Sequence, residues 1–308
     1  MPLDPQVQSV FDKLKQVGVR PLSELPIEQV RKVNLNPDPG PAQAVENVEE
    51  RFIPGPDREI GVRIYTPAGE SPFPALLYYH GGGWTLGDLE TADVLCRQIA
   101  NEVNCVVISV DYPLAPEHKF PAAAEDAFAA YMWVCDNPGL LNITSAAVTV
   151  SGDSAGANLA AVVALIARDR SVQLPLFQLL FCPVTNYAFD SQSYIDNAVG
   201  YGLTTETMKW FWSNYLNNPE DGSNPYASPL SASDLAGLPP AFIITAEYDP
   251  LRDDGEKYAT RLKESGVPVE VTRYDGMVHG FYLASGVYDQ AKVAVSQAIQ
   301  ALNRVFHA

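Results

Sequence analysis

The residues best suited to nucleophilic chemistry form the segment Gly152-Asp153-Ser154-Ala155-Gly156. It follows a β-rich run and precedes a long stretch of small and apolar residues, which is typical of the strand, sharp turn and helix of a G-x-S-x-G nucleophile elbow. A serine on this turn has a strained backbone, and the turn closes only where the flanking positions lack side chains, as Gly152 and Gly156 do. The pattern predicts that Ser154 is a nucleophile at a helix N-terminus, where the helix dipole favours a developing negative charge.

A second glycine-rich turn, "HGGGW" at residues 80–84, directly follows the apolar run "PALLYY". Glycines let a backbone present its N–H groups to an oxyanion without obstruction by side chains. In folds with a nucleophile elbow, this turn supplies one donor and the residue after the serine supplies another. We therefore expect Gly82, Gly83 and Ala155 to form an oxyanion hole. The alternatives are a flexible glycine loop and a phosphate-binding loop, but for the latter the segment lacks the lysine of a P-loop.

A hydroxyl nucleophile needs a general base, and in folds with such an elbow the base comes after both the serine and the acid along the chain. Of the four histidines, His80 and His118 precede Ser154, and His307 lies one residue from the C-terminus. His279, in a glycine-flanked turn after the last β-rich run, is therefore the predicted base.

An acid must hold the imidazole in the correct tautomer and stabilise the imidazolium that forms when the serine loses its proton. Glu247, Asp249, Asp253 and Asp254 all follow the apolar run "AFIITA". Asp249 falls in the loop at the end of that expected strand, where the following proline favours an extended residue and then a turn. Asp253 lies where a helix should begin, so we expect it to cap that helix. Asp249 is the predicted acid.

The order of the remaining segments predicts an α/β fold. Eight short β-rich runs begin near residue 48, and after the first three of them most neighbouring runs are separated by helical stretches of ten or more residues. Several runs are continuously apolar, which is typical of a mostly parallel sheet that helices cover on both faces. We therefore expect a mostly parallel eight-stranded sheet.

Two segments break this alternation and predict a helical cap. The first contains the amphipathic stretches Gln6–Val17 and Glu28–Val33, and the second contains the aromatic stretch "TTETMKWFWSNYLNN" and a turn-rich tail. Ligands of open α/β folds bind at the carboxyl edge of the sheet, so we expect the cap to cover that edge. The predicted units are a first cap segment at 1–45, a first core part at 46–185, a cap insertion at 186–236 and a second core part at 237–308.

The composition narrows the classes of partner. With 20 basic and 37 acidic residues among 308, the formal charge of -17 repels a nucleic-acid backbone and an anionic bilayer. No apolar stretch reaches the roughly 18 residues of a membrane span, and the four cysteines form no C-x-x-C pair or Cys/His cluster. We expect a cytoplasmic monomer or homodimer with free thiols, which acts on a small molecule without nucleic acid, membrane insertion, metal or cofactor.

Four blocks together resemble the hormone-sensitive-lipase-like α/β-hydrolases, the microbial group also called family IV esterases. The blocks are "HGGGW", "DYPLAPEHKFPAAAED", "GDSAG" and "DPLRDDG" followed by "HGF". The resemblance implies the α/β-hydrolase fold, a two-part cap and the triad Ser154, Asp249 and His279. It also implies hydrolysis of short- to medium-chain acyl esters through an acyl-enzyme.

The chain departs from this resemblance in one loop, because many members have arginine where this chain has Pro113. We therefore expect a local ion pair of that loop to be absent, which would affect loop packing and leave the chemistry unchanged. The neighbouring Glu117 and His118 are interpreted as structural.

Aromatic residues in and near the cap imply an apolar, covered site. The expected substrate contacts are Trp84, Asp153, Tyr187, Phe211 and Trp212. An amidase, formamidase or lactonase with the same triad is an alternative, because fold does not determine function. A non-catalytic receptor for small molecules is a further alternative, against which the intact His279 argues.

Overall fold

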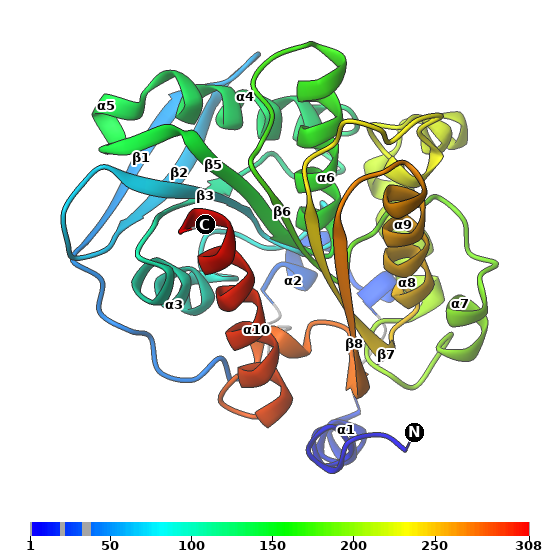
Figure 1. The fold of residues 1–308 in the computed structure, drawn as a ribbon. Coiled ribbons are helices and arrows are strands. Elements are labelled where there is room, and N and C mark those ends of the chain that lie inside the picture. The colour runs from blue at the N-terminus through cyan, green and yellow to red at the C-terminus, as the bar shows by residue number, and fades with distance from the viewer. Residues whose placement is uncertain (1, 19–21, 33–37, 308) are drawn as a thin grey trace.

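The computed structural model describes residues 2–18, 22–32 and 38–307, and it contains one sheet with helices on both faces (Figure 1). The strands are β1 (Asn47–Pro54), β2 (Glu59–Thr66), β3 (Phe73–Tyr79), β4 (Val106–Asp111), β5 (Ile143–Asp153), β6 (Gln178–Phe181), β7 (Ala241–Tyr248) and β8 (Val269–Val278). Their order is β1-β2-β4-β3-β5-β6-β7-β8, with β2 antiparallel to both of its neighbours and all later pairs parallel. The predicted mostly parallel eight-stranded α/β sheet is confirmed.

Helices connect most of these strands and also form two groups outside the alternation. Those flanking the sheet are α3 (Asp93–Val103), α4 (Ala122–Asp136), α5 (Pro138–Leu141), α6 (Ala155–Asp169), α9 (Arg252–Glu264) and α10 (Asp289–Phe306), with the short η4 (Phe281–Leu283) before α10. Before β1 lie α1 (Pro5–Val17), η1 (Leu22–Glu24) and α2 (Ile27–Val30). Between β6 and β7 lie α7 (Gln192–Asp196), α8 (Thr205–Tyr215), η2 (Pro219–Ser223) and η3 (Pro229–Ser231). Helix α2 ends before the predicted Val33, which lies outside the described residues.

The two faces of the sheet carry separate hydrophobic cores. On one face, α6 packs between the strands and α4, and every residue from Ala155 to Ala167 is buried. Its many alanines explain this position, because small side chains let the helix approach the strands closely. The opposite face is covered by α3 and α10. Central strands such as β4 are buried on both sides, as their β-branched sequence predicts.

The long closing helix α10 is amphipathic. It buries Ala291, Ala294 and Val295 against the sheet and leaves Lys292 and Val293 exposed. Among the residues described, no helix is long and apolar enough to cross a membrane.

The segments before β1 and between β6 and β7 lie beside the carboxyl edge of the sheet. The N–H of Asp4 donates to the carbonyl of Gly276 at 3.1 Å, which holds α1 at the end of β8 (Figure 1). In the second segment, the ring of Tyr201 packs on Tyr248 at the end of β7, with centroids 4.6 Å apart. Both segments are therefore placed where the parallel strands end.

The core of the sheet is expected to dominate stability. Leu77 of β3 is fully buried between β4 and β5, so Leu77→Ala should lower the free energy of unfolding by about 2–5 kcal/mol. Val293→Ala removes a side chain that is 55% exposed and should change it by less than about 0.5 kcal/mol. Guanidinium unfolding of both variants measures the difference, and equal midpoint shifts would contradict this account of the core.

Candidate active site

Three side chains from distant parts of the chain meet at the carboxyl edge of the sheet. Ser154 lies between β5 and α6, Asp249 follows β7 and His279 follows β8. Nε2 of His279 lies 3.0 Å from Oγ of Ser154, and Nδ1 of His279 lies 2.7 Å from Oδ2 of Asp249. Both are hydrogen-bond distances, so the structure brings together the three residues that the sequence singled out.

The turn that carries Ser154 is strained. The serine has φ 54° and ψ -117°, a left-handed conformation that side chains rarely adopt. Its N–H donates to the carbonyl of Phe181 at 2.8 Å, which fixes the turn against β6. A Cβ atom on Gly152 would overlap with Gly156, and one on Gly156 would overlap with the carbonyl of Tyr79. Both glycines are therefore required for the close passage of the backbone.

Burial and charge act in opposite directions on His279. Burial alone lowers the pKa of the imidazole, but the nearby charge of Asp249 and its hydrogen bond outweigh burial. The charge of Asp153 acts in the same direction, and the pKa of His279 is raised above the ordinary value of 6.5. Because a carboxylate only accepts, Nδ1 must donate to Asp249, which leaves Nε2 free to accept the hydroxyl proton of Ser154.

The loop that carries Asp249 is held by buried side chains from the segment between β6 and β7. Nδ2 of Asn197 donates to the carbonyl of Asp249 at 3.2 Å, and the hydroxyl of Ser193 donates to the carbonyl of Pro250 at 2.6 Å. One carboxylate oxygen of Asp249 also accepts the N–H of Leu251 at 2.9 Å. Sequence reasoning missed Asn197 and Ser193, because short polar residues in a turn-rich segment give no pattern.

The expectation that Asp253 caps its own helix was wrong. Helix α9 begins at Arg252 with no side-chain cap. Asp253 instead accepts the N–H of Ser193 at 2.9 Å, in the first turn of α7. It therefore ties α7 to the loop of the acid.

In the glycine turn, hydrogen bonds hold the backbone carbonyls of Gly81 and Gly82. Gly82 and Gly83 have positive φ values of 113° and 59°. The carbonyl of Gly81 accepts from Nδ1 of His80 at 2.7 Å, and the carbonyl of Gly82 accepts from the N–H of Thr85 at 3.1 Å. In a trans peptide the N–H points away from the carbonyl, so the N–H groups of Gly82 and Gly83 point away from these contacts. Neither group makes a hydrogen bond to any described residue.

The ring of His80 supports this turn in its neutral form. It is fully buried and stacks on Tyr112 with centroids 4.3 Å apart. Burial lowers the pKa of His80 to about 4, so the ring is neutral at pH 7. Because the carbonyl of Gly81 can only accept, Nδ1 carries the single ring proton and donates the hydrogen bond.

Asp153 also supports the turn. Its Oδ1 accepts from the hydroxyl of Tyr78 at 2.8 Å and from the N–H of Gly81 at 2.9 Å. Burial raises the pKa of Asp153, these hydrogen bonds and the charge of His279 oppose it, and the net value is about 6. The carboxylate therefore faces the core, where Oδ1 is occupied by Tyr78 and Gly81, and the expected contact of Asp153 with substrate stays a prediction.

The expected aromatic contacts form one layer over the turn. The ring of Phe211 lies directly against Gly83, where it occupies the place of a Cβ atom. Behind it, Trp84 stacks on Tyr215 with centroids 4.2 Å apart and lies 4.6 Å from Trp212. Ser154 is itself only 7% exposed. Tyr187 completes the layer with its ring 5.3 Å from Trp212.

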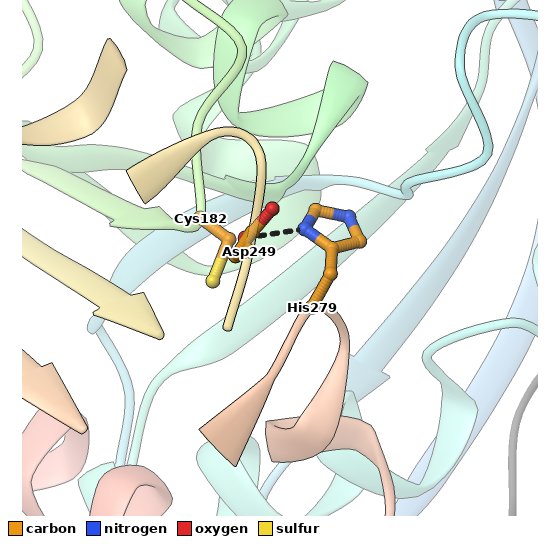
Figure 2. Close-up of side chains that lie close together, drawn as sticks. All are labelled: Cys182, Asp249 and His279. Carbon is orange, nitrogen blue, oxygen red and sulfur yellow. Dashed lines mark hydrogen bonds and ion pairs between the residues drawn. The ribbon is translucent and has the colours of Figure 1, made fainter. Parts of the chain in front are cut away.

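Cys182 lies beside the acid and the base, as Figure 2 shows. Its sulfur, an oxygen of Asp249 and a nitrogen of His279 all lie within 4.8 Å of one another. Burial, reinforced by the charge of Asp249, raises the pKa of the Cys182 thiol well above its ordinary value, so the thiol is neutral. Two ligands of one zinc ion would lie about 3.3 Å apart, whereas Asp249 and His279 are 2.7 Å apart and hydrogen-bonded. The geometry is that of a carboxylate hydrogen-bonded to an imidazole.

The loop that contains Pro113 forms an ion pair with Arg31. Both oxygens of Glu117 accept from the guanidinium of Arg31, at 2.7 and 2.9 Å. Its arginine comes from the segment before β1, so this pair differs from the one that an arginine at position 113 would make. No pattern within the loop could have indicated it.

Comparisons with known proteins agree with this geometry. Residues 76–283 match the family described as the alpha/beta hydrolase fold. The chain is 43% identical over 249 residues to the carboxylic ester hydrolase LipN of Mycobacterium tuberculosis, covering 79% of this chain and 66% of LipN. It is 39% identical over 284 residues to an arylesterase of Saccharolobus solfataricus, covering 91% of this chain and 92% of that protein. The structure of a hyperthermophilic esterase from Pyrobaculum calidifontis superposes with a TM-score of 0.92 at 41% identity, covering all of both chains.

The chain therefore belongs to the α/β-hydrolase family, in its hormone-sensitive-lipase-like branch of carboxylesterases. With LipN, the match extends over about two thirds of the relative's length. The resemblance expected from the four sequence blocks is confirmed.

The electrostatics of the triad can be measured without an assay of activity. Because Asp249 raises the pKa of His279, an NMR titration of the imidazole should give a value above 6.5 in the wild type and a lower value in Asp249→Asn. His80 serves as an internal control, since it should stay neutral in both proteins until the pH approaches 4. An unchanged His279 titration in the variant would contradict the assigned coupling.

Proposed function

We propose that this chain is a serine carboxylesterase in which Ser154 attacks the carbonyl carbon of an ester. The observation that carries the proposal is the continuous hydrogen-bonded path from Ser154 through His279 to the buried Asp249. His279 takes the hydroxyl proton, and Asp249 stabilises the imidazolium that results. The raised pKa of His279 supports this role, because it favours the protonated imidazole in the transition state.

The reaction then proceeds through an acyl-enzyme. The protonated His279 donates its proton to the leaving alcohol as the tetrahedral intermediate collapses, and the acyl group remains on Oγ of Ser154. A water molecule attacks the acyl carbon while His279 again takes a proton. The acid leaves, and Ser154 regains its hydrogen.

The oxyanion of each tetrahedral intermediate is proposed to bind the N–H groups of Gly82, Gly83 and Ala155. The support is that these three groups make no hydrogen bond to any residue in the described ranges. Ala155 is the first residue of α6, so the helix dipole adds to the stabilisation.

The proposed substrates are esters of short- to medium-chain acyl groups. The support is the aromatic layer over the site, in which the ring of Phe211 lies against Gly83 and limits the space next to the oxyanion hole. Trp212 packs against both Trp84 and Tyr187, which adds to the aromatic character of this region.

We further propose that residues 1–45 and 186–236 act as a cap over core parts 46–185 and 237–308. The support is that the described parts of both segments pack at the carboxyl edge of the sheet. A cytoplasmic location is also proposed, because all four cysteines are buried and free, which is typical of a reducing compartment.

The central test compares hydrolysis by Ser154→Ala with that of the wild type. Kcat for p-nitrophenyl butyrate should fall by about 10⁶-fold, since no other described group takes the place of the nucleophile. Ser296→Ala, an exposed serine on α10, is the matched control and should retain wild-type activity. Undiminished hydrolysis by Ser154→Ala would contradict the proposal. A higher kcat/KM of the wild type for amides than for matched esters would favour an amidase.

The role of Phe211 can be tested by acyl-chain preference. Phe211→Ala should raise kcat/KM for p-nitrophenyl decanoate relative to the butyrate, because the ring against Gly83 is gone. Lys209→Ala removes an exposed side chain of the same helix and should leave the ratio unchanged. A ratio that is equal in Phe211→Ala and wild type would show that another residue limits chain length.

A further inference from the structure

The guanidinium of Arg31, which follows α2, joins two loops of the core. Its Nε donates to the carbonyl of Thr85 at 3.0 Å, and its Nη2 donates to the carbonyl of Ala115 at 3.1 Å. Nη1 and Nη2 also donate to the two oxygens of Glu117. Arginine has five N–H donors in a rigid plane, so this arrangement occupies most of them and fixes both loops relative to each other.

The loop residues that Arg31 holds are themselves bonded to the glycine turn. The hydroxyl of Thr85 donates to the carbonyl of Gly83 at 2.9 Å, and its N–H donates to the carbonyl of Gly82. The N–H of Ala115 donates to the carbonyl of Trp84 at 2.7 Å. Arg31 therefore binds the carbonyls of Thr85 and Ala115. The N–H groups of these two residues and the hydroxyl of Thr85 in turn bind the carbonyls of three successive residues of the turn, Gly82 to Trp84.

Trp84 needs such support because its backbone is strained, whereas the two glycines adopt positive φ without strain. Gly82, Gly83 and Trp84 all have positive φ, and Trp84 reaches 55° although it carries a large side chain. A conformation of this kind persists only where the surrounding contacts enforce it. Charge-assisted hydrogen bonds from a guanidinium are stronger than neutral ones, which suits them to this task.

We propose that Arg31 is a positioning residue for the oxyanion hole, acting through Thr85 and Ala115 on the N–H groups of Gly82 and Gly83. This inference rests on the proposed function, since it assumes that those N–H groups bind the oxyanion. It gives the segment before β1 a part in the chemistry, in addition to covering the site. The same arginine makes the ion pair with Glu117 in the loop that contains Pro113.

The expected signature is a loss of kcat without a matching change in KM. Hydrogen bonds to an oxyanion strengthen in the transition state, so misplaced donors slow the reaction more than they weaken substrate binding. We expect Arg31→Ala to lower kcat for p-nitrophenyl butyrate by about tenfold, which is less than the loss of an oxyanion donor itself. The rate of inactivation by an alkyl fluorophosphonate, whose phosphoryl oxygen also needs the hole, should fall by a similar factor.

Two variants separate this role from general stability. Arg170→Ala is the matched control, because Arg170 forms a similar two-oxygen ion pair with Glu125, which joins the C-terminal end of α6 to α4. It should leave kcat within about twofold of the wild type. Glu117→Gln keeps both carbonyl contacts of Arg31 and should lower kcat less than Arg31→Ala does.

Chemical rescue provides a readout that a purely structural role would not give. The side chain of Arg31 is 30% exposed, so its removal leaves a site that ethylguanidinium can reach from solvent. Millimolar ethylguanidinium should restore part of the kcat of Arg31→Ala and leave Arg170→Ala unaffected. All variants should be compared at equal folded fractions, checked by circular dichroism.

The inference is overturned if Arg31→Ala keeps the kcat and the phosphonate reactivity of Arg170→Ala, or if its loss appears in KM alone. It is also overturned if ethylguanidinium restores nothing although the variant is folded. These outcomes leave the proposed function intact as long as Ser154→Ala is inactive. Full activity in Ser154→Ala would remove the proposed function itself, whatever Arg31→Ala does.

Discussion

The hydrogen bond between His279 and Asp249 is the contact on which the rest of the site depends. Asp249 has no exposed surface, and a charge buried in this way is costly unless other groups compensate it. The carboxylate accepts hydrogen bonds from Nδ1 of His279 and from the N–H of Leu251. The neutral thiol of Cys182 lies next to it. The same charge overcomes the effect of burial on His279 and raises its pKa. A base of this kind can then activate Ser154 on its strained turn.

Much of this arrangement could be predicted because the chemistry imposes local sequence rules. Gly152 and Gly156 must be glycines since a Cβ at either position overlaps with backbone. The chain order of serine, acid and histidine left His279 as the base by elimination. The alternation of apolar runs with long helical stretches predicted the sheet, because central parallel strands are buried on both faces.

The remaining features depend on contacts between segments far apart in sequence. Asp153 directly precedes Ser154 in the sequence, which suggested a contact with substrate. Its carboxylate points into the core, where it accepts hydrogen bonds from Tyr78 and Gly81. Asp253 lies at the start of a helix, where a capping residue is expected, but its carboxylate accepts the N–H of Ser193 instead. Arg31 reaches Thr85 and Glu117 from a segment far away in sequence, and only the fold brings them together. No local pattern encodes such pairings.

The segments outside the sheet thus do more than cover the site. Asn197 and Ser193 hold the loop of the acid from one side, and Arg31 contacts the loop next to the glycine turn from another. The central claim, that Ser154 is the nucleophile of this machinery, is tested most directly by peptide mapping after reaction with diethyl p-nitrophenyl phosphate. The account predicts a single diethylphosphoryl adduct on Ser154 that is absent from Ser154→Ala. An unmodified Ser154, or an equal adduct on the variant, would contradict it.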